Sequence, residues 1–209
     1  MRYVPNILSI SRLLATVLVF IFVLVDLPWA FLAATVVFVL GSITDLLDGY
    51  FARRWNVVSS LGVFLDLTAD KVFVSAVLIA MVQVGLVPAW IVFIIVTREF
   101  LVTSLRSVAA SQGRVIPAGM WGKQKTVLTL VAMSILLLAK GLGAHLFSLS
   151  SPFALHFTNR TFTVAEIVLL LGDGLLLLAT IWTLLSGIEY MISALPLFLR
   201  EKEKSPFHV

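Results

Sequence analysis

Apolar residues run along this chain in six long stretches, separated by short segments that are polar or rich in turn-forming residues. A helix needs about 20 apolar residues to cross a bilayer, and every stretch reaches that length. The expected helices cover residues 6–25, 29–53, 61–87, 88–111, 122–142 and 163–199. The pattern predicts an all-α polytopic membrane protein with six transmembrane helices, the last of which extends beyond the bilayer.

The composition supports this class and argues against a soluble domain. Of the 209 residues, 60% are hydrophobic and 12% are charged, and the mean hydropathy is +1.09. Soluble domains of this length carry far fewer apolar residues. No linker, charge block or internal repeat divides the chain, so we expect one domain over residues 1–209. The absence of cysteine excludes disulfide and thiolate chemistry.

The basic residues predict how the helices are oriented. With both termini in the cytoplasm, all of the 15 Lys and Arg residues except Lys140 and Arg160 fall on or near the cytoplasmic side. Cytoplasmic loops of membrane proteins carry an excess of Lys and Arg. We therefore expect both termini on the cytoplasmic side.

Four aspartates interrupt the apolar pattern at the cytoplasmic ends of the second and third expected helices: Asp45, Asp48, Asp66 and Asp70. Spacings of three and four residues place each pair on one helix face. Two antiparallel helices joined by a short turn would bring the pairs to one depth, where four carboxylates repel one another. Hard divalent cations such as Mg²⁺ or Mn²⁺ prefer carboxylate oxygens, and four ligands are enough for two ions.

Small and basic residues accompany the acids. Gly49 and Ala52 let a ligand or another helix approach the backbone, although ordinary helix packing also uses small residues. Arg53 suits a phosphate, although it could equally anchor the helix at the interface. The acids themselves could instead cap helices or pair with Arg53, Arg54 and Lys71. The spacing of these residues does not distinguish between a metal and phosphate site and these structural roles.

The whole stretch follows the pattern D-x2-D-G-x2-A-R-x8-G-x3-D-x3-D from Asp45 to Asp70. It resembles the signature of the CDP-alcohol phosphotransferase family of integral membrane enzymes. The resemblance implies a six-helix, homodimeric enzyme that transfers a phosphoalcohol group from a CDP-linked donor to an alcohol and releases CMP. It implies that Asp45, Asp48 and Asp66 bind metal, and that Asp70 is the general base while also contacting a metal. It also places Gly49, Ala52 and Arg53 against the cytidine diphosphate.

A second polar set lies near the cytoplasmic ends of the fourth and fifth expected helices: Arg98, Arg106, Lys123 and Lys125. Positive-inside anchoring explains part of it. Arg98 lies deeper in an apolar run, where a charge indicates a function. Glu99 is expected to point elsewhere on the helix. Several cations beside a metal site favour an acceptor that is itself an anion.

The segments "VPNILSISRL", "REFLVTSLR" and "GKQKTVLTLVAM" resemble a bacterial branch of the same family. That resemblance implies CDP-diacylglycerol as donor, sn-glycerol 3-phosphate as acceptor and an active site on the cytoplasmic face of the bacterial plasma membrane. The four basic residues then become candidates for binding the acceptor phosphate.

Other hypotheses remain beside this one. The acceptor could be phosphatidylglycerol, as in cardiolipin synthesis, or inositol phosphate. A cation-coupled transporter is a more distant alternative, because transporters place acids near the midplane of several helices. No nucleic-acid partner is expected. Asp173, an acid within the last apolar stretch, has no assigned role.

Overall fold

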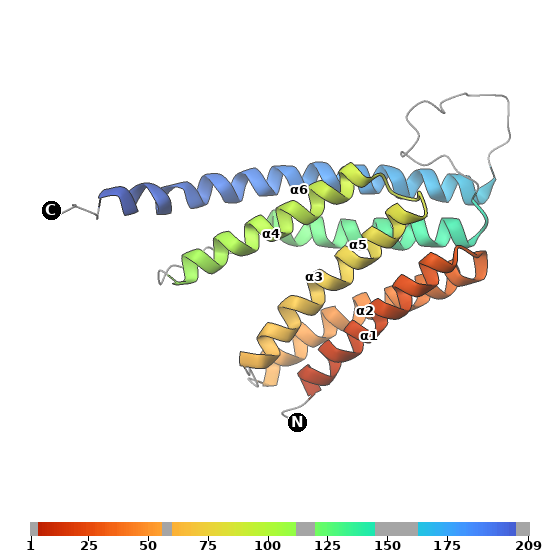
Figure 1. The fold of residues 1–209 in the computed structure, drawn as a ribbon, viewed down its shortest axis with the longest axis horizontal. Helices are drawn as coiled ribbons and strands as arrows, with labels where there is room; N and C mark the ends of the chain where they lie inside the picture. The colour runs from red at the N-terminus through yellow and green to blue at the C-terminus, as the bar shows by residue number, and fades with distance from the viewer. Residues whose placement is uncertain (1–3, 56–59, 112–119, 145–162, 204–209) are drawn as a thin grey trace.

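Six α-helices follow one another along the chain, one for each apolar stretch (Figure 1). They are α1 (Val4–Val25), α2 (Pro28–Trp55), α3 (Ser60–Gln83), α4 (Ala89–Ser111), α5 (Met120–Gly141) and α6 (Val164–Glu203). This computed structural model describes the backbone of residues 4–55, 60–111, 120–144 and 163–203, and the side chains of residues 10–44, 68–111, 122, 124–144 and 163–192. The described residues form no strand, which confirms the all-α class.

Two helices, α3 and α5, end in glycine turns. α3 was predicted to continue to residue 87 but ends at Gln83, because Gly85 takes a positive φ of 70°. The Leu86 amide then donates to the Met81 carbonyl at 2.8 Å, and the Gly85 amide to Val82 at 3.0 Å. Gly143, with φ of 84°, ends α5 with the same hydrogen-bond pattern. Glycine adopts this left-handed conformation without steric cost, and the turn satisfies the last carbonyls of each helix.

The turns at residues 26–27, 84–88 and 142–144 lie at one end of the molecule, which we call the turn end (Figure 1). The end of α2, the start of α3, the end of α4 and the start of α5 lie at the opposite end, the pocket end. At the pocket end α1, α2 and α3 diverge from α4 and α6.

The helices pack as two groups. In the first, α1 contacts both α2 and α3; in the second, α6 contacts both α4 and α5. Contacts of α2 with α5 and of α3 with α4 join the groups. Phe38 of α2 stacks on Phe73 of α3 with ring centroids 4.9 Å apart, and both are buried. Aromatic pairs of this kind add to the stabilisation from apolar burial.

The contact of α2 with α5 depends on a glycine. A Cβ atom at Gly141 would lie 2.8 Å from Leu32 Cδ2 and 3.0 Å from the Leu32 backbone nitrogen. We therefore expect Gly141→Ala to lower the free energy of unfolding by about 1–3 kcal/mol, the usual cost of overpacking. The measurement is thermal unfolding of the protein in detergent.

Gly174 of α6 provides the matched control, because a Cβ atom there would meet nothing within 4 Å. Gly174→Ala is expected to leave stability unchanged or raise it by up to about 1 kcal/mol through helix propensity. Equal unfolding temperatures for the two variants would contradict close packing at Gly141.

Candidate active site

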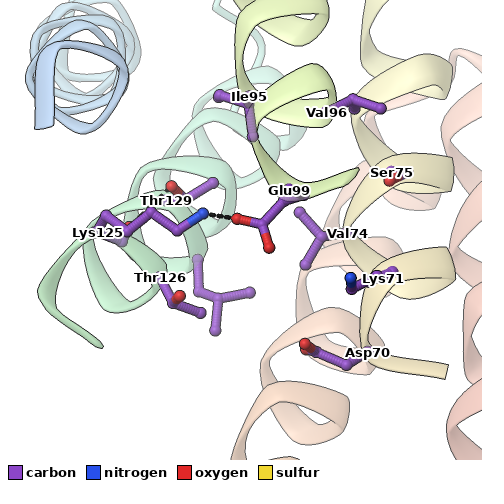
Figure 2. A pocket seen from close by; sticks show the side chains of 11 residues that line it. Asp70, Lys71, Val74, Ser75, Ile95, Val96, Glu99, Lys125, Thr126 and Thr129 are labelled. Carbon is purple, nitrogen blue, oxygen red and sulfur yellow. Dashed lines mark hydrogen bonds and ion pairs between the residues drawn. The ribbon is translucent and has the colours of Figure 1, made fainter. Parts of the chain in front are cut away.

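A small pocket opens between α3, α4 and α5 (Figure 2). Polar and charged side chains alternate with apolar ones along its wall. It is lined by Asp70, Lys71, Val74, Ser75, Ile95, Val96, Glu99, Lys125, Thr126, Thr129 and Leu130. Two acids and two lysines from three helices therefore share one cavity.

Asp70 and Lys71 form the α3 side of this pocket (Figure 2). Asp70 is half-buried. Lys71 donates through Nζ to the Thr103 hydroxyl and lies over the Phe100 ring at 5.9 Å from its centroid. The Thr103 hydroxyl in turn donates to the Glu99 carbonyl at 2.8 Å. These contacts tie α3 to α4 directly beside the predicted base.

Glu99 and Lys125 form the opposite side. Lys125 is only 4% exposed, and its ammonium pairs with Glu99 Oε1. The same carboxylate oxygen lies 3.1 Å from Arg98 Nη1 and accepts a hydrogen bond from it. The expectation that Glu99 points away from Arg98 was wrong: both side chains are long enough to meet although they leave the helix in different directions.

Arg98 lies behind this pair and is held by α6. Its Nη2 donates to the Ser186 hydroxyl at 3.0 Å, and its guanidinium carbon is 5.6 Å from the centroid of the Tyr190 ring. A Cβ atom at Gly187 would lie 3.1 Å from Arg98 Cγ, and one at Gly122 would lie 3.9 Å from Nη2. The two glycines leave the space through which the arginine reaches α6. An arginine in such a slot makes cation–π and hydrogen-bond contacts together.

For most of the other predicted site residues the structure describes the backbone but not the side chain, and Arg106 lies outside the pocket. Asp45, Asp48, Gly49, Ala52 and Arg53 belong to α2, and Asp66 to α3, so the helical spacing assumed for both acid pairs holds. Their side chains, and that of Lys123, lie outside the described residues. Arg106 is exposed, and neither it nor Arg98 is among the described residues that line the pocket.

Among the described side chains, no three His, Cys, Asp or Glu residues gather in a way that could hold a metal ion. Asp70 is the single member of the acid motif whose side chain is described. The donor chemistry of the motif nevertheless suits a hard divalent cation, because all four side chains are carboxylates at helical spacings.

Sequence reasoning missed Glu99 and Lys71 as pocket residues. A signal existed for Glu99: an acid in an apolar helix needs a partner, and "GKQKT" supplies lysines at the start of the next helix. Lys71 offered no such signal, because its contact with Thr103 depends on how α3 and α4 pack.

A family model described as CDP-alcohol phosphatidyltransferase matches residues 2–195. The chain belongs to this family. The resemblance drawn from residues 45–70 is thereby confirmed, and the match covers nearly the whole chain.

Three relatives of this CDP-alcohol phosphatidyltransferase carry the name CDP-diacylglycerol–glycerol-3-phosphate 3-phosphatidyltransferase. The Bacillus subtilis protein is 50% identical over 113 residues, which cover 54% of this chain and 58% of the relative. The Rickettsia bellii protein is 39% identical over 134 residues, covering 64% and 74%. The Pseudomonas fluorescens protein is 32% identical over 199 residues, covering 92% and 90%.

Proposed function

We propose that this protein transfers the phosphatidyl group of CDP-diacylglycerol to sn-glycerol 3-phosphate, giving phosphatidylglycerophosphate and CMP. The observation that carries the proposal is one pocket with Asp70 on one wall and Lys125 on the other (Figure 2). The first supplies a base and the second a cation for an anionic acceptor. The names of the relatives support the same donor and acceptor.

The carboxylates of Asp45, Asp48, Asp66 and Asp70 are proposed to hold two Mg²⁺ or Mn²⁺ ions. When bound, such ions neutralise the donor diphosphate and stabilise the CMP leaving group. Gly49, Ala52 and Arg53 share α2 with two of these acids. We assign them to the cytidine diphosphate, with Arg53 as a fixed cation for its phosphates.

Asp70 acts as the general base in this proposal. It takes the proton from the acceptor hydroxyl while the hydroxyl oxygen attacks the phosphorus of the phosphatidyl group. A new phosphorus–oxygen bond forms as the bond to the CMP phosphate breaks, and CMP leaves. A carboxylate in this position must lie within hydrogen-bond reach of the hydroxyl.

Lys125 is the proposed main contact for the acceptor phosphate, since it lines the pocket. Arg98, Arg106 and Lys123 complete the candidate set: Arg98 lies directly behind Lys125, and the other two lie nearer the pocket end. Charge-assisted hydrogen bonds from such cations are the strong contacts that phosphate recognition uses.

We place the six helices across the bacterial plasma membrane, with both termini and the pocket on the cytoplasmic side. Among the described residues, Gln124–Gly141 and Val164–Ile192 are long and apolar enough to cross a membrane. Large apolar side chains such as Phe93 and Val164 are more than two thirds exposed, at 70% and 75%, as lipid-facing residues are. The family match supports a single domain over residues 1–209. A homodimer is also proposed, on family resemblance alone.

The proposal predicts CMP release from CDP-diacylglycerol by purified protein in detergent with Mg²⁺ or Mn²⁺ and glycerol 3-phosphate. Chelation by EDTA is expected to abolish turnover, and added metal to restore it. Inositol phosphate and phosphatidylglycerol are assayed in parallel. Turnover with only one of these two would reassign the acceptor. If folded protein released no CMP with any acceptor, the proposed transferase activity would be refuted.

A further inference from the structure

Glu99 is the acid of the pocket that the proposed reaction does not use. It lies on α4, across the cavity from Asp70, and its Oε1 is shared by the Lys125 ammonium and Arg98 Nη1. In Figure 2 its second carboxylate oxygen points into the space between α5 and α3. The side chain is 28% exposed, whereas that of Lys125 is 5% exposed. The carboxylate therefore lies between a buried cation and the open cavity.

The electrostatics of this arrangement require a counter-ion. A buried ammonium without a partner is costly, and here a second cation, Arg98, lies beside the same oxygen. Glu99 offsets that charge. The contact also occupies the ammonium that the acceptor phosphate would use, so an incoming anion must compete with a carboxylate already in place.

We infer that Glu99 is a positioning residue, an internal counter-ion that holds Lys125 until the anionic group of the acceptor replaces its carboxylate there. After the exchange Glu99 keeps its hydrogen bond from Arg98, which α6 fixes through Ser186, so the carboxylate is not left unpaired. An alcohol without a phosphate cannot make this exchange. The inference rests on the proposed function for its acceptor, and it makes the affinity for the acceptor phosphate depend on displacement of the Glu99 carboxylate from Lys125.

The test measures binding of inorganic phosphate to the full chain in detergent, by calorimetry and by thermal stabilisation at constant ionic strength. Glu99→Gln removes the competing charge and leaves the buried lysine in need of an anion. The dissociation constant for inorganic phosphate is therefore expected to fall about tenfold or more relative to the wild type. The double variant Glu99→Gln, Lys125→Gln lacks both charges, and the gain should disappear.

Two further variants complete the design. Glu189→Gln removes an exposed acid from α6 and should leave phosphate binding unchanged. Glu99→Asp keeps the charge but shortens the side chain, so phosphate binding should tighten less than in Glu99→Gln. It also keeps the test informative if Glu99→Gln does not fold. An unchanged or weaker affinity for phosphate in both Glu99 variants would overturn the inference.

Steady-state kinetics of Glu99→Gln provide a second readout, which would differ if Glu99 only maintained the structure of the pocket. In Glu99→Gln the KM for glycerol 3-phosphate should fall while kcat changes little, whereas disruption of the pocket would raise KM and lower kcat. Phosphate binding needs neither donor nor turnover. If Glu99→Gln binds phosphate more tightly but the protein releases no CMP with any acceptor, the proposed function is refuted and the counter-ion role is not. If the protein releases CMP but Glu99→Gln does not bind phosphate more tightly, the counter-ion role alone is refuted.

Discussion

Replacement of Asp70 by asparagine is expected to lower kcat by about 10²–10⁴-fold, the usual contribution of a positioned general base. The amide keeps the size and shape of the side chain but cannot take up the hydroxyl proton. Because Asp70 is half-buried in the pocket wall, the substitution should leave the fold intact. The measurement is the initial rate of CMP release at saturating CDP-diacylglycerol and glycerol 3-phosphate.

Asp26→Asn is the matched control for this variant. Asp26 lies in the turn between α1 and α2, is exposed, and has a φ of 52°, which asparagine also tolerates. Lys140 Nζ lies 3.9 Å from its Oδ1. Activity of Asp26→Asn should equal that of the wild type. If Asp70→Asn retained comparable activity with the same unfolding temperature, Asp70 would not be the base.

Replacement of Lys125 by methionine is expected to raise the KM for glycerol 3-phosphate by about 10–100-fold. A hydrogen bond to a charged group contributes about 1.5–3 kcal/mol, and methionine fills similar space without donating one. Glu99 stays hydrogen-bonded to Arg98 in this variant, so its carboxylate keeps a partner. The KM for CDP-diacylglycerol should change little, because the donor site is assigned to α2 and the start of α3.

Lys140→Met tests whether any lysine of α5 has this effect. Lys140 lies at the turn end of the same helix, over the Phe31 ring at 5.8 Å, far along the chain from the pocket. Its substitution should leave both KM values unchanged. An equal rise in the KM for donor and acceptor in Lys125→Met would indicate general damage to the pocket and contradict a specific acceptor contact.

The helices could be predicted from sequence because each apolar stretch is long and has clear borders. The ends of α3 and α6 each differ by four residues from the expected bounds; α3 stops early because a single glycine turn ends the helix before the apolar residues end. Hydropathy does not detect such a turn, because Leu86 and Val87 remain buried after the helix has ended. The pairing of α1 with α3 and of α5 with α6 was likewise not accessible, since it depends on small residues such as Gly172 and on which faces meet.

The candidate site divides in the same way. The acid motif could be found from spacing because all four aspartates lie within two consecutive helices. The contacts of Arg98 could not, because they depend on α6, whose Ser186 and Tyr190 are distant in sequence. A set of basic residues near one membrane face does not reveal which of them reaches a cavity and which is fixed behind it.

The turn at residues 84–88 joins α3 and α4 at the turn end, so the orientation of α4 depends on the geometry of this turn. α4 has 23 residues, so a small rotation about the turn at residues 84–88 is amplified along the helix. With a rise of 1.5 Å per residue, a tilt of about 5° moves the far end of the helix by about 3 Å, roughly the diameter of a water molecule. The position of the α4 wall of the pocket, which carries Ile95, Val96 and Glu99, therefore depends on an angle between helices whose pivot lies at the turn end.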